Sequence, residues 1–365
     1  MSKQVKTPRF YVDIPTFLHA TGELGWDDYY GGAELLYMNP SNPYINDTQS
    51  DFEFGIGHLE DNNPKTSFPI NFCALLNHNL ASDTSTFTTP AYKGLVEEDE
   101  SDTRLERMDG YQNVLNSTVQ NNNPEFNGTS IWTFTEVDAY WRAFGLYFVD
   151  TPDDYPHQLG SFVVGRYWDA PHSPDLSLTM SRRFDGIKRQ KTINGKTLAN
   201  IYYDSPTEWT MHNPTDGTYP YPPFELDLPT ANDLTPSDFN QIAKSGLGRK
   251  GLRSWKLTFS YISESDMWID NEVSNTLIND SEESSYANPM LSDDSFNFVW
   301  NCTLGGTLPF IFQPDGPQYD SSGDKIQGNN NPDQFSICTF RGNSLSVKQV
   351  AHNTYSLSIT IDEVA

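Results

Sequence analysis

The stretch Pro309-Phe310-Ile311-Phe312-Gln313-Pro314-Asp315 is the starting point for the fold. It is apolar on both sides and bracketed by prolines, which lack the backbone N–H that a central strand donates. These features predict a short edge or capping strand over residues 310–312. A strand of this kind needs a larger sheet beside it, so the neighbouring segments decide the fold class.

Segments on both sides of this stretch alternate large apolar residues with polar ones. The alternation is clearest in residues 253–261, in the triplet Phe296, Phe298 and Trp300, and in residues 355–361. Strict alternation marks a strand that buries one face, which is typical of antiparallel sheets. The sequence therefore predicts a mainly β fold.

The N-terminal half contributes apolar runs that also read as strands. Residues 10–14 end at Pro15, and Phe72-Cys73-Ala74-Leu75-Leu76 has the pattern of a strand buried on both faces,. Residues 131–134, 140–150 and 162–168 continue the sheet. Helix signals are few, at residues 235–246 and 263–277.

The strand pattern predicts three parts. Residues 1–170 should form an N-terminal β-sandwich. Residues 171–245, which include a tract rich in Pro, Tyr, Thr and Asp, should be a connector with irregular loops,. Residues 246–365 should form a second antiparallel β domain with one or two short helices.

Composition and charge restrict the partners. The net charge is −26, so nucleic acid is not an expected partner of the whole molecule,. No apolar run approaches the roughly 20 residues that span a bilayer, so we expect no membrane insertion. We expect the protein to be synthesised in a cytoplasm. Cys73, Cys302 and Cys338 lack metal-site spacing and are interpreted as small buried residues,.

The sequence contains no arrangement that predicts catalysis. It has no Gly-x-Ser-x-Gly elbow, no His-Glu-x-x-His motif and no phosphate-binding Gly-Lys-Ser/Thr loop,. His78 lies between Asn77 and Asn79 after the apolar run. It is interpreted as a residue that fixes the strand end, the alternative being the rim of a sugar site. We therefore predict a protein that is not an enzyme and has no catalytic or metal-ligating residues.

Basic residues are crowded into two short segments of this acidic chain, which hold ten of its 23 lysines and arginines. The first segment contains Arg182, Arg183, Lys188, Arg189 and Lys191, and the second contains Lys244, Arg249, Lys250, Arg253 and Lys256. One interpretation is pairing with acidic groups of the same chain. The other is a subunit contact, in which a basic segment meets an acidic face of a second copy and the strand at Phe310 and Phe312 adds apolar area.

Two stretches resemble tail-associated virion proteins of tailed bacteriophages. Cys73-Ala74-Leu75-Leu76-Asn77-His78-Asn79-Leu80 resembles the apolar run and His-Asn-Leu signature of those with a discoidin-like, galactose-binding-type β-sandwich. Residues 141–149 and 159–166, the latter ending in Gly165-Arg166, resemble later strands of that sandwich. The resemblance implies that the sandwich of residues 1–170 is of the jelly-roll or galactose-binding type. Residues 81–130 and 264–295 look like insertions, so ligand loops do not carry over. The resemblance also implies that a structural calcium is conceivable, with Asp47, Asp51, Glu53, Glu60 and Asp61 as hard oxygen ligands,.

The resemblance implies a structural component of a phage tail, at the tip, baseplate or an adaptor. Its expected partners are further copies of itself in a homo-oligomeric ring, other tail proteins and a host surface glycan, and its expected location is the virion. One alternative is a carbohydrate-binding protein for receptor recognition, with Trp132, Trp141 and Trp168 as candidate stacking residues,. A second alternative is a capsid or head-completion protein.

Overall fold

A computed structural model gives the fold of the chain. The residues that it describes are 5–22, 29–30, 44–46, 52–57, 68–78, 86–87, 91–94, 106–107, 112–113, 128–137, 141–149, 157–183, 187–201, 252–269, 291, 293–319, 325–326, 328–330 and 334–364. The fold is mainly β, as the alternating sequence pattern predicts. The described helices are short: α1 (Ile14–Thr21), α3 (Glu264–Met267) and α5 (Phe296–Cys302).

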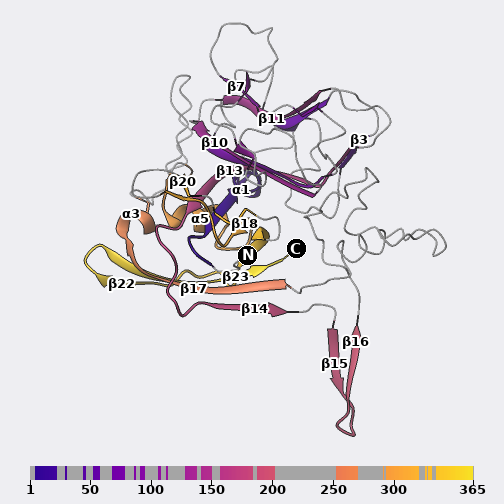
Figure 1. Ribbon diagram of the computed structural model, residues 1–365, viewed down its shortest axis with the longest axis vertical. Coiled ribbons are helices and arrows are strands. Elements are labelled where there is room, and N and C mark those ends of the chain that lie inside the picture. Colours follow the sequence, from indigo (N-terminus) through magenta and orange to yellow (C-terminus); the bar gives the residue numbers. More distant parts are fainter. Residues whose placement is uncertain are drawn as a thin grey trace, which may run out of the picture.

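The largest element is an eleven-stranded antiparallel sheet (Figure 1). Its strands, in spatial order, are β14 (Thr179–Arg183), β17 (Leu252–Ser263), β23 (Thr354–Glu363), β21 (Ser336–Phe340), β18 (Phe310–Gln313), β1 (Arg9–Asp13), β13 (Ser161–Asp169), β5 (Ile70–His78), β10 (Gly128–Val137) and β9 (Gln112–Asn113). The eleventh strand, β22 (Val347–Ala351), pairs with β23 outside this path.

A six-stranded sheet packs on the large sheet at β10 and β13. It consists of β2 (Tyr29–Tyr30), β4 (Phe52–Gly57), β11 (Trp141–Val149), β7 (Ala91–Gly94) and β8 (Glu106–Arg107), with β6 (Thr86–Phe87) also paired to β11. Phe144 of β11 lies 5.8 Å from Phe134 of β10 and 6.2 Å from Phe162 of β13, between ring centroids. Stacked sheets that share apolar inner faces give this part a sandwich-like character.

Three two-stranded ribbons complete the described strands. They are β12 (His157–Leu159) with β3 (Tyr44–Asn46), β15 (Ile187–Lys191) with β16 (Thr197–Ile201), and β19 (Gln318–Tyr319) with β20 (Lys325–Ile326). The β15–β16 ribbon projects away from the large sheet (Figure 1).

Strand β1 links the N-terminal and C-terminal parts of the chain. It pairs with β13 on one side and with β18 on the other, so that Arg9 faces both Asp169 and Gln313. The large sheet thus runs without a break through strands from all three predicted parts. The predicted division into separate β domains is not confirmed.

The prediction for β18 as an edge or capping strand is wrong, because β18 lies inside the sheet between β1 and β21. Its paired residues are 310–313, so Pro309 and Pro314 fall outside the ladder and remove no hydrogen bond from it. Phe310 and Phe312 enter the main core, while Ile311 enters a second cluster on the opposite face. Two covered faces explain why the segment is apolar on both sides.

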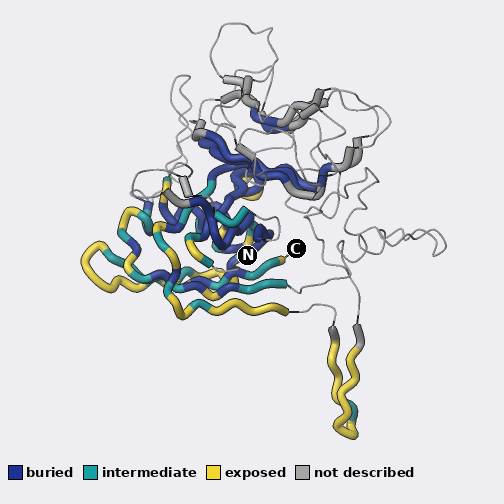
Figure 2. The backbone as a smooth tube through the Cα atoms, in the orientation of Figure 1, coloured by how far each residue is buried: buried dark blue, intermediate teal, exposed yellow. Residues whose placement is uncertain are grey.

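Other strand predictions are confirmed. Trp255, Leu257 and Phe259 alternate toward the core along β17, and β23 buries every second residue in the same way. Strand β5 begins directly after Pro69, and its side chains belong to both core clusters. In Figure 2 the buried stretches lie in the body of the molecule.

Two helices replace predicted features. Phe296, Phe298 and Trp300 lie in α5 and not in a strand, because Phe296, Val299 and Cys302 share the buried side at helical spacing,. Pro15 does more than end the first strand, since it occupies the first turn of α1,. The helix expected over 263–277 is described only as α3, and residues 235–246 lie outside the described part.

Candidate functional site

The tryptophans predicted to stack on sugar are not on the surface. Trp132 is fully buried in β10 and Trp168 is 4% exposed in β13. The indole N–H of Trp168 donates to the backbone carbonyl of Asp294 at 2.8 Å. Neither ring offers a face to a ligand, so their stacking role does not fit the structure. The side chain of Trp141 lies outside the described residues.

Three predicted contact residues also belong to the interior. Phe310 and Phe312 are fully buried in the main core. Arg253 of β17 forms a two-pronged ion pair with Glu363 of β23, with Nε–Oε2 at 3.0 Å and Nη2–Oε1 at 2.8 Å. It also donates to the carbonyl of Phe335 at 3.0 Å. For Arg253 the intramolecular interpretation of the basic segments is therefore the right one. Arg249 and Lys250 lie outside the described residues.

The other described residues of the two basic segments do lie on the surface, and Lys244 is outside the described part of the chain. Arg182 and Arg183 end β14, which is the exposed terminal strand of the large sheet. Lys188, Arg189 and Lys191 lie on β15, where they are exposed. We call the ribbon of residues 187–201 the arm. Figure 2 shows it as an exposed projection outside the buried body of the molecule.

A tight turn gives the arm its shape. The backbone N–H of Thr192 donates to Lys196 at 2.8 Å, and the N–H of Gly195 donates to Thr192 at 2.9 Å. Gly195 has φ +75°, a left-handed conformation that glycine adopts without strain,. The turn places Ile193 at the tip, fully exposed, and Leu198 on the second strand, 55% exposed.

Apolar side chains are also exposed within and just before β14. Leu176 precedes β14 and is fully exposed, and Met180 within β14 is 43% exposed. Single exposed apolar residues are ordinary, but here four of the eight large ones in the described residues occur in one 23-residue stretch, at 176–198,. An apolar and basic projection on an acidic protein has the composition of a contact surface.

His78 lies at the end of β5, as predicted, but its ring is buried. Its Nε2 is 2.9 Å from Oγ of Ser130 on β10. Burial lowers the pKa of His78 to about 3, so the ring is neutral at physiological pH. These observations favour the structural interpretation of His78 over a sugar-site rim.

The described residues hold no cluster of His, Cys, Asp and Glu suited to a metal ion. The side chains of the five candidate calcium ligands lie outside the described residues. Cys73, Cys302 and Cys338 are buried free thiols, as predicted, and burial raises the pKa of each.

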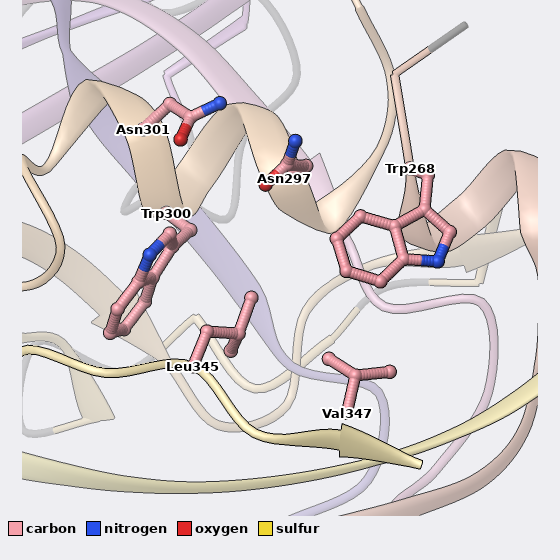
Figure 3. Close-up of a pocket in the computed structure, with 6 residues that line it drawn as sticks. All are labelled: Trp268, Asn297, Trp300, Asn301, Leu345 and Val347. Atoms are coloured by element: carbon pink, nitrogen blue, oxygen red, sulfur yellow. The ribbon is translucent and has the colours of Figure 1, made fainter. Parts of the chain in front are cut away.

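A pocket that the sequence did not suggest lies between α3, α5 and the start of β22. Its volume is about 530 Å³. It is lined by Trp268, Asn297, Trp300, Asn301, Leu345 and Val347. Figure 3 shows the two indole rings at opposite ends, with Asn297 between them on the helix side and Leu345 and Val347 across from it. We call this the tryptophan pocket.

Helix α3 sets the position of Trp268. Ser263 caps the helix by accepting from the backbone N–H of Asp266 at 3.1 Å, while its hydroxyl donates to the Asp266 carboxylate at 2.5 Å,. The helix ends after one turn at Trp268, whose backbone N–H donates to Glu264 at 2.9 Å. The Trp268 ring meets Tyr355 edge to face at 6.0 Å.

Helix α5 positions the other three polar and aromatic side chains that line the pocket. Arg166 of β13 holds the segment before it, donating to the Asp293 carbonyl at 2.9 Å and to the Asp294 carboxylate at 2.6 Å. With Phe296 and Val299 turned into the core, Asn297, Trp300 and Asn301 face the pocket,. The Trp300 ring packs on Phe340 at 5.5 Å.

The lining of the tryptophan pocket favours binding over chemistry. None of its six residues is a carboxylic acid, histidine, lysine, cysteine or hydroxyl residue. General acid–base and nucleophilic catalysis need such groups within hydrogen-bonding reach of the substrate. Amides and indoles recognise a ligand without transforming it.

Comparisons with known proteins give no relative: no family model, no curated protein and no solved structure matches the chain. Among the described helices, none has the length and apolar character required to span a bilayer.

Proposed function

We propose that the protein is a structural subunit of a bacteriophage tail that assembles with copies of itself into a ring through the arm. The observation that carries the proposal is the projecting β15–β16 ribbon, with its exposed basic and apolar residues. The assignment to a phage tail rests on the resemblance of residues 73–80, 141–149 and 159–166. The virion is the corresponding location.

The arm has the features of an interface rather than of a folding element. Its two strands pair with each other, at Lys188–Asn200 and Arg189–Ala199, and with no other described strand. The residues of a projecting ribbon lose conformational entropy when they become ordered. In this ribbon, little side-chain packing is present to offset that loss. Burial against a partner would supply the missing apolar contact.

A second copy of the chain is the partner that the charges favour. The chain has a net charge of −26, and the arm carries Lys188, Arg189, Lys191 and Lys196 on one ribbon. A basic projection attracts an acidic surface, and each copy supplies both. A contact between two different surfaces repeats around an axis and closes as a ring when the rotation permits.

Sedimentation velocity of the purified full chain tests the contact. We expect a self-associated species for the wild type and a monomer for the variant Ile193→Ser/Leu198→Ser, with unchanged melting because both side chains are exposed. Val350→Ser is the matched control, since Val350 is 43% exposed on β22. A wild-type monomer at all concentrations, or a double variant that associates normally, would contradict the proposal.

Imaging of phage particles with a label fused to this protein tests the location. Labels arranged around the tail axis are expected. Labels on the head would support the capsid or head-completion alternative instead.

A further inference from the structure

We propose that the tryptophan pocket binds a neutral saccharide. The inference is independent of the arm, because the pocket is built from α3, α5 and residues 345–347. Its volume of about 530 Å³ lies within the range of about 300–1,000 Å³ that small-molecule sites occupy,. A ligand must therefore match two indoles, two amides and two aliphatic side chains.

A sugar ring presents two kinds of surface at once. Its C–H faces are apolar and pack on aromatic rings, while hydroxyls around its edge both donate and accept hydrogen bonds. Trp268 and Trp300 supply the aromatic surfaces,. Asn297 and Asn301 each carry a carbonyl acceptor and an amide donor, the combination that a hydroxyl can satisfy.

The lining also indicates the charge of the ligand. None of the six lining residues is ionisable, so no fixed charge would pair with a carboxylate, phosphate or amine on the ligand. A charged ligand would lose hydration on entry without a compensating ion pair. Neutral hexoses and their oligomers avoid that penalty, whereas acidic sugars do not.

The aromatic surfaces are already held in place. Tyr355 contacts the Trp268 ring edge to face, and Phe340 packs on Trp300. Both indoles are partly buried against the main core, which limits their rotation. Side chains ordered before binding lose less entropy when the ligand arrives.

An apolar peptide segment is the competing occupant. It would fill the space beside Leu345 and Val347, but its apolar side chains would offer no hydrogen-bonding group to Asn301, which lines the same pocket. Covering a polar group without replacing its water is unfavourable. The Asn301 amide therefore favours the sugar.

Saturation-transfer NMR with the full chain tests the proposal, using cellobiose, maltose and lactose as probes. We expect transfer to at least one of the three, with binding about tenfold weaker in Trp268→Ala, the scale of losing one aromatic contact. Asn301→Ala should weaken binding as well, and it leaves the aromatic packing intact. Leu198→Ala on the arm is the control and should bind like the wild type.

Three results would overturn the proposal. One is no transfer to any probe in the wild type. Another is undiminished transfer in a folded Asn301→Ala/Trp268→Ala double variant, which would place sugar binding elsewhere. The third is stronger transfer to acetyl-Leu-Leu-amide, lost in Trp268→Ala, which would assign the pocket to a peptide.

Discussion

Arginine side chains in this protein have different roles according to their burial. The side chains of Arg253 and Glu363 are only 13% and 10% exposed, and they form a two-pronged pair. Arg341 and Asp362 form a similar pair on the surface, where the Arg341 side chain is 63% exposed. We therefore expect the buried pair to contribute strongly to stability and the exposed pair to contribute little.

Replacing either arginine tests that contrast. Arg253→Ala should lower the free energy of unfolding by roughly 3–5 kcal/mol, because Glu363 would stay buried without its partner. Arg341→Ala should lower it by less than about 1 kcal/mol, since water screens the exposed pair. Urea denaturation of both variants checks the difference. Equal losses would show that burial does not set the contribution of Arg253.

Asp13 gives the fold a specific pH dependence. Burial raises the pKa of its carboxyl from 3.8 to about 7, although hydrogen bonds from Thr16 and from the backbone of Val164 lower it. Between these two values the folded protein holds a proton that the unfolded chain releases. Unfolding is then favoured as the pH rises from about 4 to about 7, because proton release accompanies it.

The difference in stability between the wild type and Asp13→Asn isolates this effect, since the variant lacks the titration. Relative to the variant, the wild type should lose stability as the pH rises through this window and change little above it. A constant difference between pH 4 and 8 in chemical denaturation would show that Asp13 does not titrate as described.

At the scale of elements, the central strands of the large sheet hold fully buried side chains. Strand β5 lies between β13 and β10, and Leu75 is fully buried in the main core. Leu75→Ala should cost roughly 2–5 kcal/mol, the range for a leucine removed from a packed core. Leu198→Ala, in an exposed strand of the arm, should cost less than about 0.5 kcal/mol. Thermal and urea unfolding of the two variants measure the difference. Similar losses of unfolding free energy would show that Leu75 is not in the core.

Some elements follow from sequence pattern and others require the pairing to be known. Alternation identifies β17 and β23, because each buries one face, and the apolar run identifies β5. The interior position of β18 depends on its pairing with β1, where Arg9 faces Gln313. No local pattern reports a partner so distant in sequence, so the bracketing prolines suggested an edge.

The pocket was missed for the same reason. Its lining comes from α3, α5 and residues 345–347, which are brought together only by the fold. The alternation of Phe296, Phe298 and Trp300 predicts a strand, whereas the buried Val299 and Cys302 give the segment helical spacing. The basic part of the arm was recognised as unusual because charge crowding is visible without the fold.

The whole molecule combines a strongly acidic chain with a basic projection. A net charge of −26 repels copies from one another at long range, and that repulsion is screened within about 8–10 Å at physiological salt,. A short basic arm can act within that distance, while its apolar tip supplies contact area. Salt should therefore affect how fast copies associate more than how tightly they hold.

The most direct test of the account is zero-length carbodiimide cross-linking of mixed assemblies of unlabelled and ¹⁵N-labelled chains, read by mass spectrometry. This reagent joins a lysine to a carboxylate only when they are in contact. We predict cross-links of mixed isotope from Lys188, Lys191 or Lys196 of one copy to Asp or Glu of another. Lys256 and Lys348, which are exposed elsewhere, should give none or few. Arm lysines that cross-link only within single chains, or not at all, would contradict the account.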